Sequence, residues 1–340
     1  MTRRAAALAL VVLLMPVYGY GREADGALGL IRTPNNGMPA IVAPGGAFEA
    51  VLVHEAELFL VGDPDAIALE AIWSGLPGGR KRALCVVPEH VVPGRYALEA
   101  RTRDALDHNV RAVFVYARFP DYYVVAHLTD THVGSTRHAR PAETIFADLI
   151  RAVNDSDATL AAITGDLTDD GTPEQLRAFL RVLDTCRLPT FVQPGNHDRE
   201  SLHYEAFLGP PTYMFRYGYD GFLAFDTKDF VMADELGRQD ADLQVFRRAL
   251  KPCRWAVGLT HRFEPMMGMR SQLILFVDEP LDALLFGHFH RENTPEEALA
   301  PWGKTQLIMT PAAVYGWLRF VDMTVSGVLA RPSEQRANIE

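Results

Sequence analysis

The chain has 340 residues, enough for one large or two ordinary domains that each bury a hydrophobic core. Hydrophobic residues make up 48% of the sequence and charged residues 22%, the composition of a globular protein rather than a disordered one. The formal net charge is −10 and no block of Lys and Arg appears, so general nucleic-acid binding is not expected.

Residues 1–21 have the pattern of a secretory signal peptide. Arg3 and Arg4 are followed by an apolar stretch over 5–17 and by small residues around Gly19 and Gly21. This stretch is too short to span a bilayer comfortably, and no later segment is long enough. We therefore expect a secreted or cell-envelope protein without a transmembrane helix after signal removal. An uncleaved segment that anchors the N-terminus is the alternative.

The cysteines are few for an exported protein. Cys85, Cys186 and Cys253 cannot form a disulfide framework, because three cysteines leave at least one unpaired. Cys186 and Cys253 each lie between an expected helix and the next strand, so one bridge between them is possible. Two small buried hydrophobic side chains are the preferred interpretation.

Residues 22–118 are predicted to form a domain of short strands. Apolar runs separated by Pro-Gly and Asn-Gly turn sequences occur at 48–53, 58–61, 67–73, 84–87, 96–100 and 110–116. This pattern predicts a small β-sandwich that resembles an immunoglobulin-like module. No residue in it is expected to carry chemistry, so we expect a scaffold or a docking module for a partner.

Residues 119–325 show a different pattern, in which strands alternate with helices. Strands are expected at 122–128, 158–164, 190–193, 213–217, 222–225, 254–260, 283–286, 305–310 and 314–322, and helices at 141–153, 173–185 and 239–250. Such alternation, followed by closing strands, predicts an α/β fold with mixed sheets. Residues 326–340 are expected to form a C-terminal tail.

Potential metal ligands follow five of these strands. Carboxylate, imidazole and amide side chains at the carboxyl ends of strands are suited to a site for divalent ions. The candidates are Asp130, His132, Asp166, Asn196, His261, His288 and His290. Gly165, Gly195 and Gly287 each precede a candidate, consistent with turns that bring the backbone close to an ion.

Together these motifs resemble the signature of the calcineurin-like metallophosphoesterase superfamily. They are Asp-x-His at 130–132, Gly-Asp at 165–166, Gly-Asn-His-Asp at 195–198, His261, and Gly-His-x-His at 287–290. The resemblance implies an αββα sandwich, in which two mixed sheets face each other between helical layers. The stretch 165–171 is most similar to class III cyclic-nucleotide phosphodiesterases, a pattern that many other phosphoesterases share.

The resemblance also implies roles for the individual residues. Two divalent transition-metal ions (Mn, Fe, Zn or similar) would bind, the first to Asp130, His132 and His290, the second to Asn196, His261 and His288, with Asp166 bridging both. A hydroxide between the ions would attack a phosphate mono- or diester. His197 would protonate the leaving oxygen, and Asp198 would orient the imidazole of His197.

Other polar residues near the motifs have weaker assignments. Arg199, His203 and Arg262 could contact substrate oxygens, with solvated surface positions as the alternative. His127 is expected in the core, and Asp169 and Asp170 are both expected to be turn residues that support the ligands.

Comparison within the superfamily narrows the expected site. Purple acid phosphatases would have Gly at position 132 and a Tyr ligand near 169, whereas this chain has His132 and Asp169. A tyrosinate-bound ferric site is therefore not expected. A non-catalytic metal-binding or docking protein that retains the fold is the alternative function. Because no ligand of the signature is missing, we favour an exported, metal-dependent phosphoric ester hydrolase. Nothing in the sequence indicates an oligomeric state.

Overall fold

The structure is a computed structural model that describes residues 26–62, 65–199, 201–226, 244–263, 274–278, 280–301 and 303–340. The expected signal peptide and the start of the helix expected at 239–250 lie outside these ranges, whereas residues 244–250 are helical. No helix among the described residues is both long and apolar enough to cross a membrane.

The N-terminal region is all-β, as the apolar runs predicted. Its strands are β1 (Ile31–Thr33), β2 (Ala40–Val42), β3 (Ala47–Leu52), β4 (Glu57–Val61), β5 (Ala66–Gly75), β6 (Lys81–Val86), β7 (Gly94–Arg101) and β8 (Leu106–Val115). They form one hydrogen-bonded path in the order β1-β3-β6-β5-β4-β7-β8-β2. The long strand β5 pairs with β4 through its first residues and with β6 through its last, so it passes from one layer to the other. The immunoglobulin-like topology stays a prediction.

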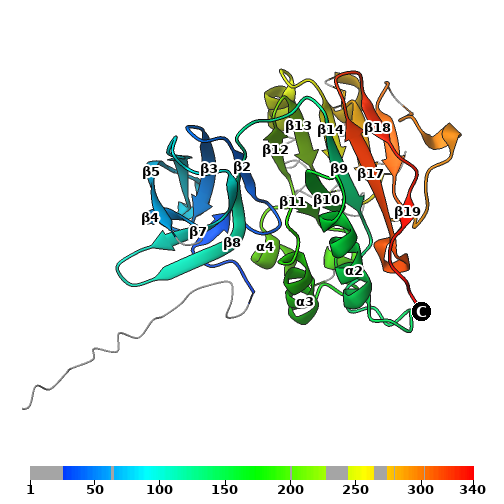
Figure 1. The fold of residues 1–340 in the computed structure, drawn as a ribbon, viewed down its shortest axis with the longest axis horizontal. Coiled ribbons are helices and arrows are strands. Elements are labelled where there is room, and N and C mark those ends of the chain that lie inside the picture. The colour runs from blue at the N-terminus through cyan, green and yellow to red at the C-terminus, as the bar shows by residue number, and fades with distance from the viewer. Residues whose placement is uncertain are drawn as a thin grey trace, which may run out of the picture.

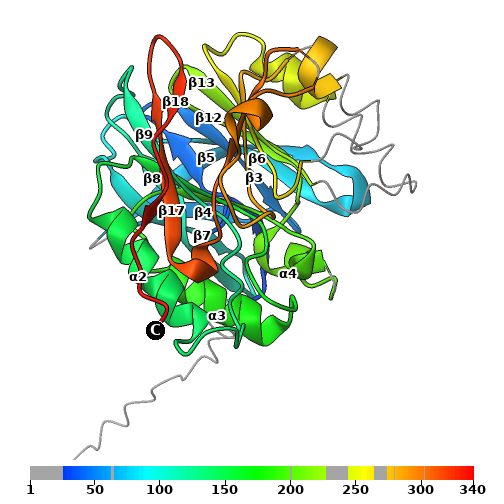
Figure 2. The same cartoon turned by 90° about the vertical axis from the view of Figure 1, so that its right-hand side faces the viewer.

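The rest of the chain forms two mixed sheets, which confirms the predicted fold class (Figure 1 and Figure 2). The first has the order β11-β10-β9-β17-β18, with β9 (Tyr123–Leu128), β10 (Leu160–Thr164), β11 (Thr190–Gln193), β17 (Trp317–Met323) and β18 (Val328–Ala330). The second has the order β12-β13-β14-β15-β16, with β12 (Tyr213–Tyr217), β13 (Asp220–Ala224), β14 (Ala256–Leu259), β15 (Ala283–Phe286) and β16 (Gln306–Met309).

Helices are few and short. The α-helices whose bounds are described are α2 (Ala142–Asn154), α3 (Pro173–Leu183) and α4 (Tyr204–Leu208). Short helical turns are η1 (Pro77–Gly79), η2 (His197–Arg199), η4 (Ile274–Asp278), η5 (Pro295–Glu297) and η6 (Ala313–Tyr315). The starts of α2 and α3 agree with the predicted helices because Pro141 and the Thr172-Pro173 pair mark them.

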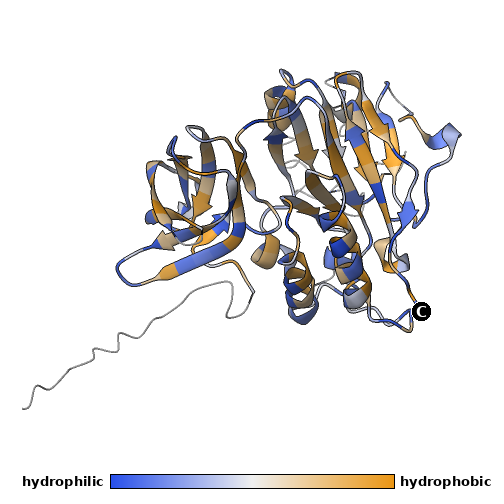
Figure 3. Cartoon of the chain, viewed as in Figure 1, coloured by the Kyte–Doolittle hydropathy of each residue, from blue (hydrophilic) through white to orange (hydrophobic). Residues whose placement is uncertain are grey.

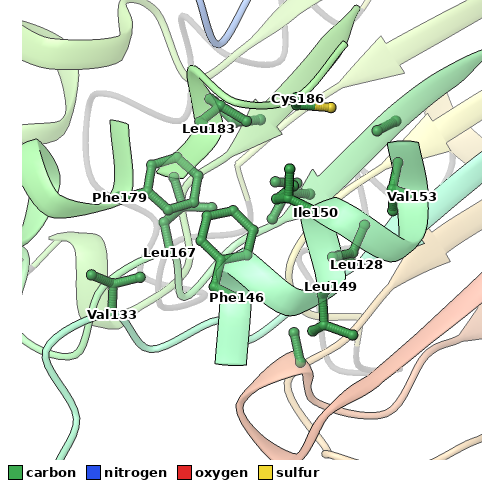
Figure 4. Close-up of a cluster of buried hydrophobic side chains, with 14 of the residues drawn as sticks. Leu128, Val133, Phe146, Leu149, Ile150, Val153, Leu167, Phe179, Leu183 and Cys186 are labelled. Carbon is green, nitrogen blue, oxygen red and sulfur yellow. The ribbon is translucent and has the colours of Figure 1, made fainter. Parts of the chain in front are cut away.

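Strand β9 shows how the layers are built. Val124, Ala126 and Leu128 contact the core beneath α2 and α3, where Phe146 and Phe179 stack with ring centroids 5.1 Å apart (Figure 4). Tyr123 and Val125 point the other way, into the core between the two sheets. Both faces of β9 are therefore buried, which explains why its sequence is apolar throughout. In Figure 3 the strands are mostly hydrophobic, whereas much of the surface of α2 and α3 is hydrophilic.

The expected C-terminal tail is instead part of the first sheet. Strand β18 pairs with β17 through Val321↔Ala330, and β19 (Glu334–Gln335) pairs with it through Trp317↔Gln335. Strands this short carry too little alternation of polar and apolar residues to be recognised in a sequence.

The cysteines form no disulfide. Cys186 lies in the core beneath α2 and α3, and Cys253 packs against the core on the outer face of the second sheet. The preferred interpretation of both as small buried hydrophobic side chains is confirmed for Cys186, whereas Cys253 is only partly buried.

Candidate metal centre

The seven candidate ligands follow the carboxyl ends of five strands. Asp130 and His132 follow β9, Asp166 follows β10, Asn196 follows β11, His261 follows β14, and His288 and His290 follow β15. The structure brings six of these side chains together with that of His197 in three overlapping groups: Asp130, His132 and His290; His132, Asp166 and His197; and Asp166, His261 and His288. Within each group the potential ligand atoms all lie within 4.8 Å of one another.

Distances divide the cluster into two adjoining halves. In one half, Oδ1 of Asp130 lies 3.1 Å from Nε2 of His290 and 4.0 Å from Nε2 of His132. In the other, Nε2 of His261 lies 3.2 Å from Oδ2 of Asp166 and 3.2 Å from Nδ1 of His288. Because Nε2 of His132 also lies 3.7 Å from Oδ2 of Asp166, Asp166 stands between the halves.

Several of these atoms are buried without a hydrogen bond. Oδ1 of Asp130, both ring nitrogens of His132 and Oδ1 of Asn196 form none with any described residue. Buried polar atoms are almost always paired, and leaving one unpaired is costly. Carboxylate, imidazole and amide oxygen are ligands that divalent transition metals accept. The cluster therefore fits a dinuclear metal centre.

The backbone at the cluster adopts a conformation that side chains disfavour. Five candidate ligands have positive φ: Asp130 (55°), His132 (42°), Asp166 (46°), His288 (71°) and His290 (57°). Among the other described residues that are not glycine, only Arg111 and Leu202 have a positive φ. Such residues cost about 1–3 kcal/mol each and gather at functional sites, where the surrounding fold holds them in place.

The glycines before the ligands allow close approach of the backbone. A Cβ atom at Gly195 would lie 2.0 Å from Oδ1 of Asp166, and one at Gly287 would lie 2.5 Å from Oδ2 of Asp130. Gly165 packs in the same way against the side chain of His261. Any larger residue at these positions would displace a candidate ligand.

The charges of the buried groups compensate one another. Burial raises the pKa of Asp130, but His261 and His290 outweigh it and hold this pKa below its ordinary value. Burial lowers the pKa of His261, yet Asp166 and Asp130 raise it to about 9. For His288, burial and the neighbouring His261 lower the pKa to about 4. The carboxylates are thus ionised near neutral pH and provide negative charge for cations.

The sequence signature is borne out by a match to a known family. Residues 123–292, half of the chain, match the calcineurin-like phosphoesterase family. The chain belongs to this family. No curated protein matches the chain.

Two solved structures are similar to parts of this chain. A purple acid phosphatase, PPD1, from seeds of yellow lupin (Lupinus luteus) is 12% identical, with a TM-score of 0.49, over 84% of this chain and 71% of that chain. A dimetal phosphatase from Danio rerio is 10% identical, with a TM-score of 0.50, over 63% of this chain and 98% of that chain. At such low identity the likeness to the Danio rerio phosphatase concerns the fold alone.

In this phosphoesterase family member, Asp198 does not orient His197 as the sequence suggested. Its carboxylate accepts hydrogen bonds from the backbone N–H groups of Leu167 (3.0 Å), Thr168 (3.0 Å) and Gly195 (2.8 Å). Side chains of consecutive residues do not face each other in a helical turn, and both residues lie in η2. Burial and nearby Asp166 raise the pKa of Asp198 to about 6. Asp198 thus ties the loop after β10 to the loop after β11.

Asp169 contacts the histidines instead. Its backbone oxygen lies 2.6 Å from Nδ1 of His197, and its Oδ1 lies 3.1 Å from Nδ1 of His132. Arg137 is 3.7 Å from the same carboxylate. Asp169 thus lies beside two histidines of the cluster, whereas Asp170 bonds to Gln175, and nothing in the sequence distinguished the two residues.

The candidate substrate contacts differ in their surroundings. Arg199 forms an ion pair with Asp226 and a longer one of 3.7 Å with Glu205, and its side chain is only 14% exposed. His203 is exposed just before α4, and Arg262 is partly buried beside His261. Arg199 is therefore engaged by carboxylates rather than directed at a substrate. His127 is fully buried, as expected.

One aromatic neighbour of the cluster carried no signal in the sequence. The ring of Tyr315 lies 5.6 Å from that of His290 and 5.0 Å from that of His138. Its turn η6 is held by backbone bonds from Ala313 to Thr129 (2.8 Å) and from Val314 to Asp130 (3.0 Å). Tyr315 thus lies beside the candidate ligands although it is far from their motifs in the sequence.

Proposed function

We propose that this protein is an exported hydrolase of phosphate mono- or diesters that uses two divalent transition-metal ions. The supporting observation is that carboxylate and imidazole atoms from the loops after β9, β10, β11, β14 and β15 form three overlapping groups, each with its atoms within 4.8 Å of one another. Several of the candidate ligand atoms are also buried without a hydrogen bond. We assign the first ion to Asp130, His132 and His290, the second to Asn196, His261 and His288, and the bridging position to Asp166. Bound ions would supply Lewis acidity and a nucleophile that acts near neutral pH.

His197 is proposed to deliver a proton to the leaving oxygen. Because Nδ1 of His197 lies 2.6 Å from the carbonyl oxygen of Asp169, it carries the proton in that hydrogen bond. The other nitrogen, Nε2, faces the cluster and lies 3.9 Å from Oδ2 of Asp166. It is thus the atom that can hold or release a proton next to a bound ester.

The proposal is tested by metal analysis and a panel of esters. Purified protein is expected to contain about two transition-metal ions per chain. It should hydrolyse some of a set of aryl phosphate mono- and diesters and cyclic nucleotides, assayed with Mn, Zn, Fe and Mg. Asp166→Asn and His290→Ala should lose metal and activity, whereas the control variant His90→Ala, altered at an exposed histidine of the N-terminal region, should keep both.

Two outcomes would contradict parts of this proposal. Folded protein that holds two ions but hydrolyses no member of the panel would favour the non-catalytic alternative. Export is tested separately by the mass of the protein recovered outside the cytoplasm, where cleavage is expected after Gly19 or Gly21. Recovery of an uncleaved chain in the cytoplasm would show that residues 1–21 are not an export signal.

A further inference from the structure

An irregular pair of strands in the N-terminal region directs one arginine out of its own sheet. Between β7 and β8 the register shifts, so that Leu98 faces Asn109 but Tyr96 faces Val113. Arg111 lies in the extra length of β8 with a φ of 51° and is 5% exposed. Bulges re-aim side chains, and a positive φ at a residue with a side chain costs about 1–3 kcal/mol. The fold holds this strained conformation so that Arg111 points at a neighbouring element.

That element is the start of β11 in the phosphoesterase domain. Nη2 of Arg111 donates to the backbone oxygen of Leu188 (2.5 Å) and to Oγ1 of Thr190 (3.3 Å). Nη1 donates to Oδ1 of Asn36, which lies in the N-terminal region. Burial lowers the pKa of Arg111 to about 10, so the guanidinium is charged near neutral pH. Hydrogen bonds from a charged donor are stronger than neutral ones.

A second contact holds the same strand further along. The backbone N–H of Val192 donates to the carbonyl oxygen of Gly37 (2.9 Å). Gly37 lies so close to β11 that a Cβ atom there would be 2.7 Å from the Val192 side chain and 2.8 Å from that of Leu208. Strand β11 is the last strand of its sheet, so its outer edge is open to pairing. The N-terminal region lies against this edge and covers it (Figure 1).

Strand β11 leads directly to the metal centre. It ends at Gln193, and the next residues include Asn196, a proposed ligand, and His197, the proposed proton donor. We propose that the N-terminal region is a positioning element of this centre, with Arg111 and Gly37 fixing β11 so that Asn196 and His197 reach the cluster. The effect of this positioning on catalysis rests on the proposed function, whereas the contacts that fix β11 do not depend on it.

The main test replaces Arg111 in the full-length protein. Arg111→Met should weaken binding of the second equivalent of Mn²⁺ about tenfold or more and leave the first unchanged, the size of effect expected of residues that orient ligands. In the metal-free protein, amide hydrogen exchange over residues 190–198 should accelerate by a similar factor. Arg111→Lys, which keeps the charge without the guanidinium fork, should give intermediate values. The matched control is Arg95→Met, since exposed Arg95 donates its 3.4 Å hydrogen bond to the backbone oxygen of Cys186 and not to Leu188 or Thr190.

A second pair of variants is needed because Arg111→Met could fail to fold. Gly37→Ala places a methyl group against Val192 and should produce the same two changes. Gly75→Ala is its control, since a Cβ atom there meets nothing within 4 Å. The inference would be overturned if Gly37→Ala and folded Arg111→Met both bound Mn²⁺ and exchanged amide hydrogens as the wild-type protein does.

The unmodified protein separates this inference from the proposed function. If it binds two ions but hydrolyses nothing, only the proposed function is contradicted. If it binds no ion, hydrogen exchange in the variants decides the positioning role.

Discussion

The backbone oxygen of Asp169 lies 2.6 Å from Nδ1 of His197, while the carboxylate of the same residue lies 3.1 Å from Nδ1 of His132. Asp169 thus holds the ring of His197 through a hydrogen bond and places its carboxylate beside the ring of His132, without a hydrogen bond between them. Their other nitrogens then face Asp166, at 3.9 Å from His197 and 3.7 Å from His132. A hydrogen bond such as that between His197 and the carbonyl oxygen of Asp169 fixes both the tautomer and the direction of a histidine at a metal site.

Removing the imidazole of His197 should impair proton transfer without loss of metal. We expect His197→Ala to lower kcat about 10²–10⁴-fold for an ester with a poor leaving group, the range usual for general acid catalysis. The loss should be much smaller for an aryl ester whose leaving group needs no proton. His90→Ala, at an exposed histidine of the N-terminal region, serves as the control. Equal losses on both esters would show that His197 does not act as the acid.

The carboxylate of Asp169 can be tested separately from its backbone oxygen. Asp169→Asn keeps the carbonyl that faces His197 but removes the negative charge beside His132. The first metal equivalent should then bind about 10–100-fold more weakly, as measured by titration with Mn²⁺. Asp170→Asn is the matched control, since exposed Asp170 accepts a hydrogen bond from Gln175 instead. Unchanged affinity in Asp169→Asn would mean that its carboxylate does not support His132.

Asp198 should matter for stability more than for proton transfer. Its carboxylate accepts three backbone N–H groups and the hydroxyl of Thr168, and it is fully buried. Asp198→Asn should lower the free energy of unfolding by about 3 kcal/mol, because hydrogen bonds to a charged acceptor are lost and buried donors remain. Urea unfolding in the presence of chelator measures this, with exposed Asp104→Asn as control. A variant with unchanged stability but reduced kcat would instead support the role that the sequence suggested.

These residues show what the sequence could predict. The ligands were predictable because each follows a buried strand, and the carboxyl ends of neighbouring strands meet at one edge. The hydrogen bonds of Asp198 and Asp169 were not, since they depend on the geometry of two turns that meet only in the folded protein. The contacts of Arg111 with the start of β11 could not be predicted for a similar reason, because the direction of its side chain depends on a register shift between β7 and β8. Strands of two or three residues, such as β18 and β19, were missed because they are too short to show a pattern.

His127 makes the stability of the protein sensitive to acid. The imidazole is fully buried between the hydroxyls of Thr164 (2.8 Å) and Thr310 (2.7 Å). Burial, and then the charge of Arg319, lower its pKa to about 3. In the unfolded chain a histidine has a pKa of about 6.5. Between these values the unfolded state binds a proton that the folded state does not, so stability falls as the pH falls.

Replacement of His127 should remove part of this acid sensitivity. The proton linkage amounts to about 2 kcal/mol between pH 7 and pH 5. His127→Gln is expected to be less stable than wild type at pH 7, but to lose about 2 kcal/mol less on acidification to pH 5. Urea unfolding at both pH values, with chelator and at constant ionic strength, measures the difference. Exposed His90→Gln should behave as wild type. If His127→Gln and wild type lost equal stability between the two pH values, the buried imidazole would have to accept a proton in the folded protein as readily as in the unfolded chain.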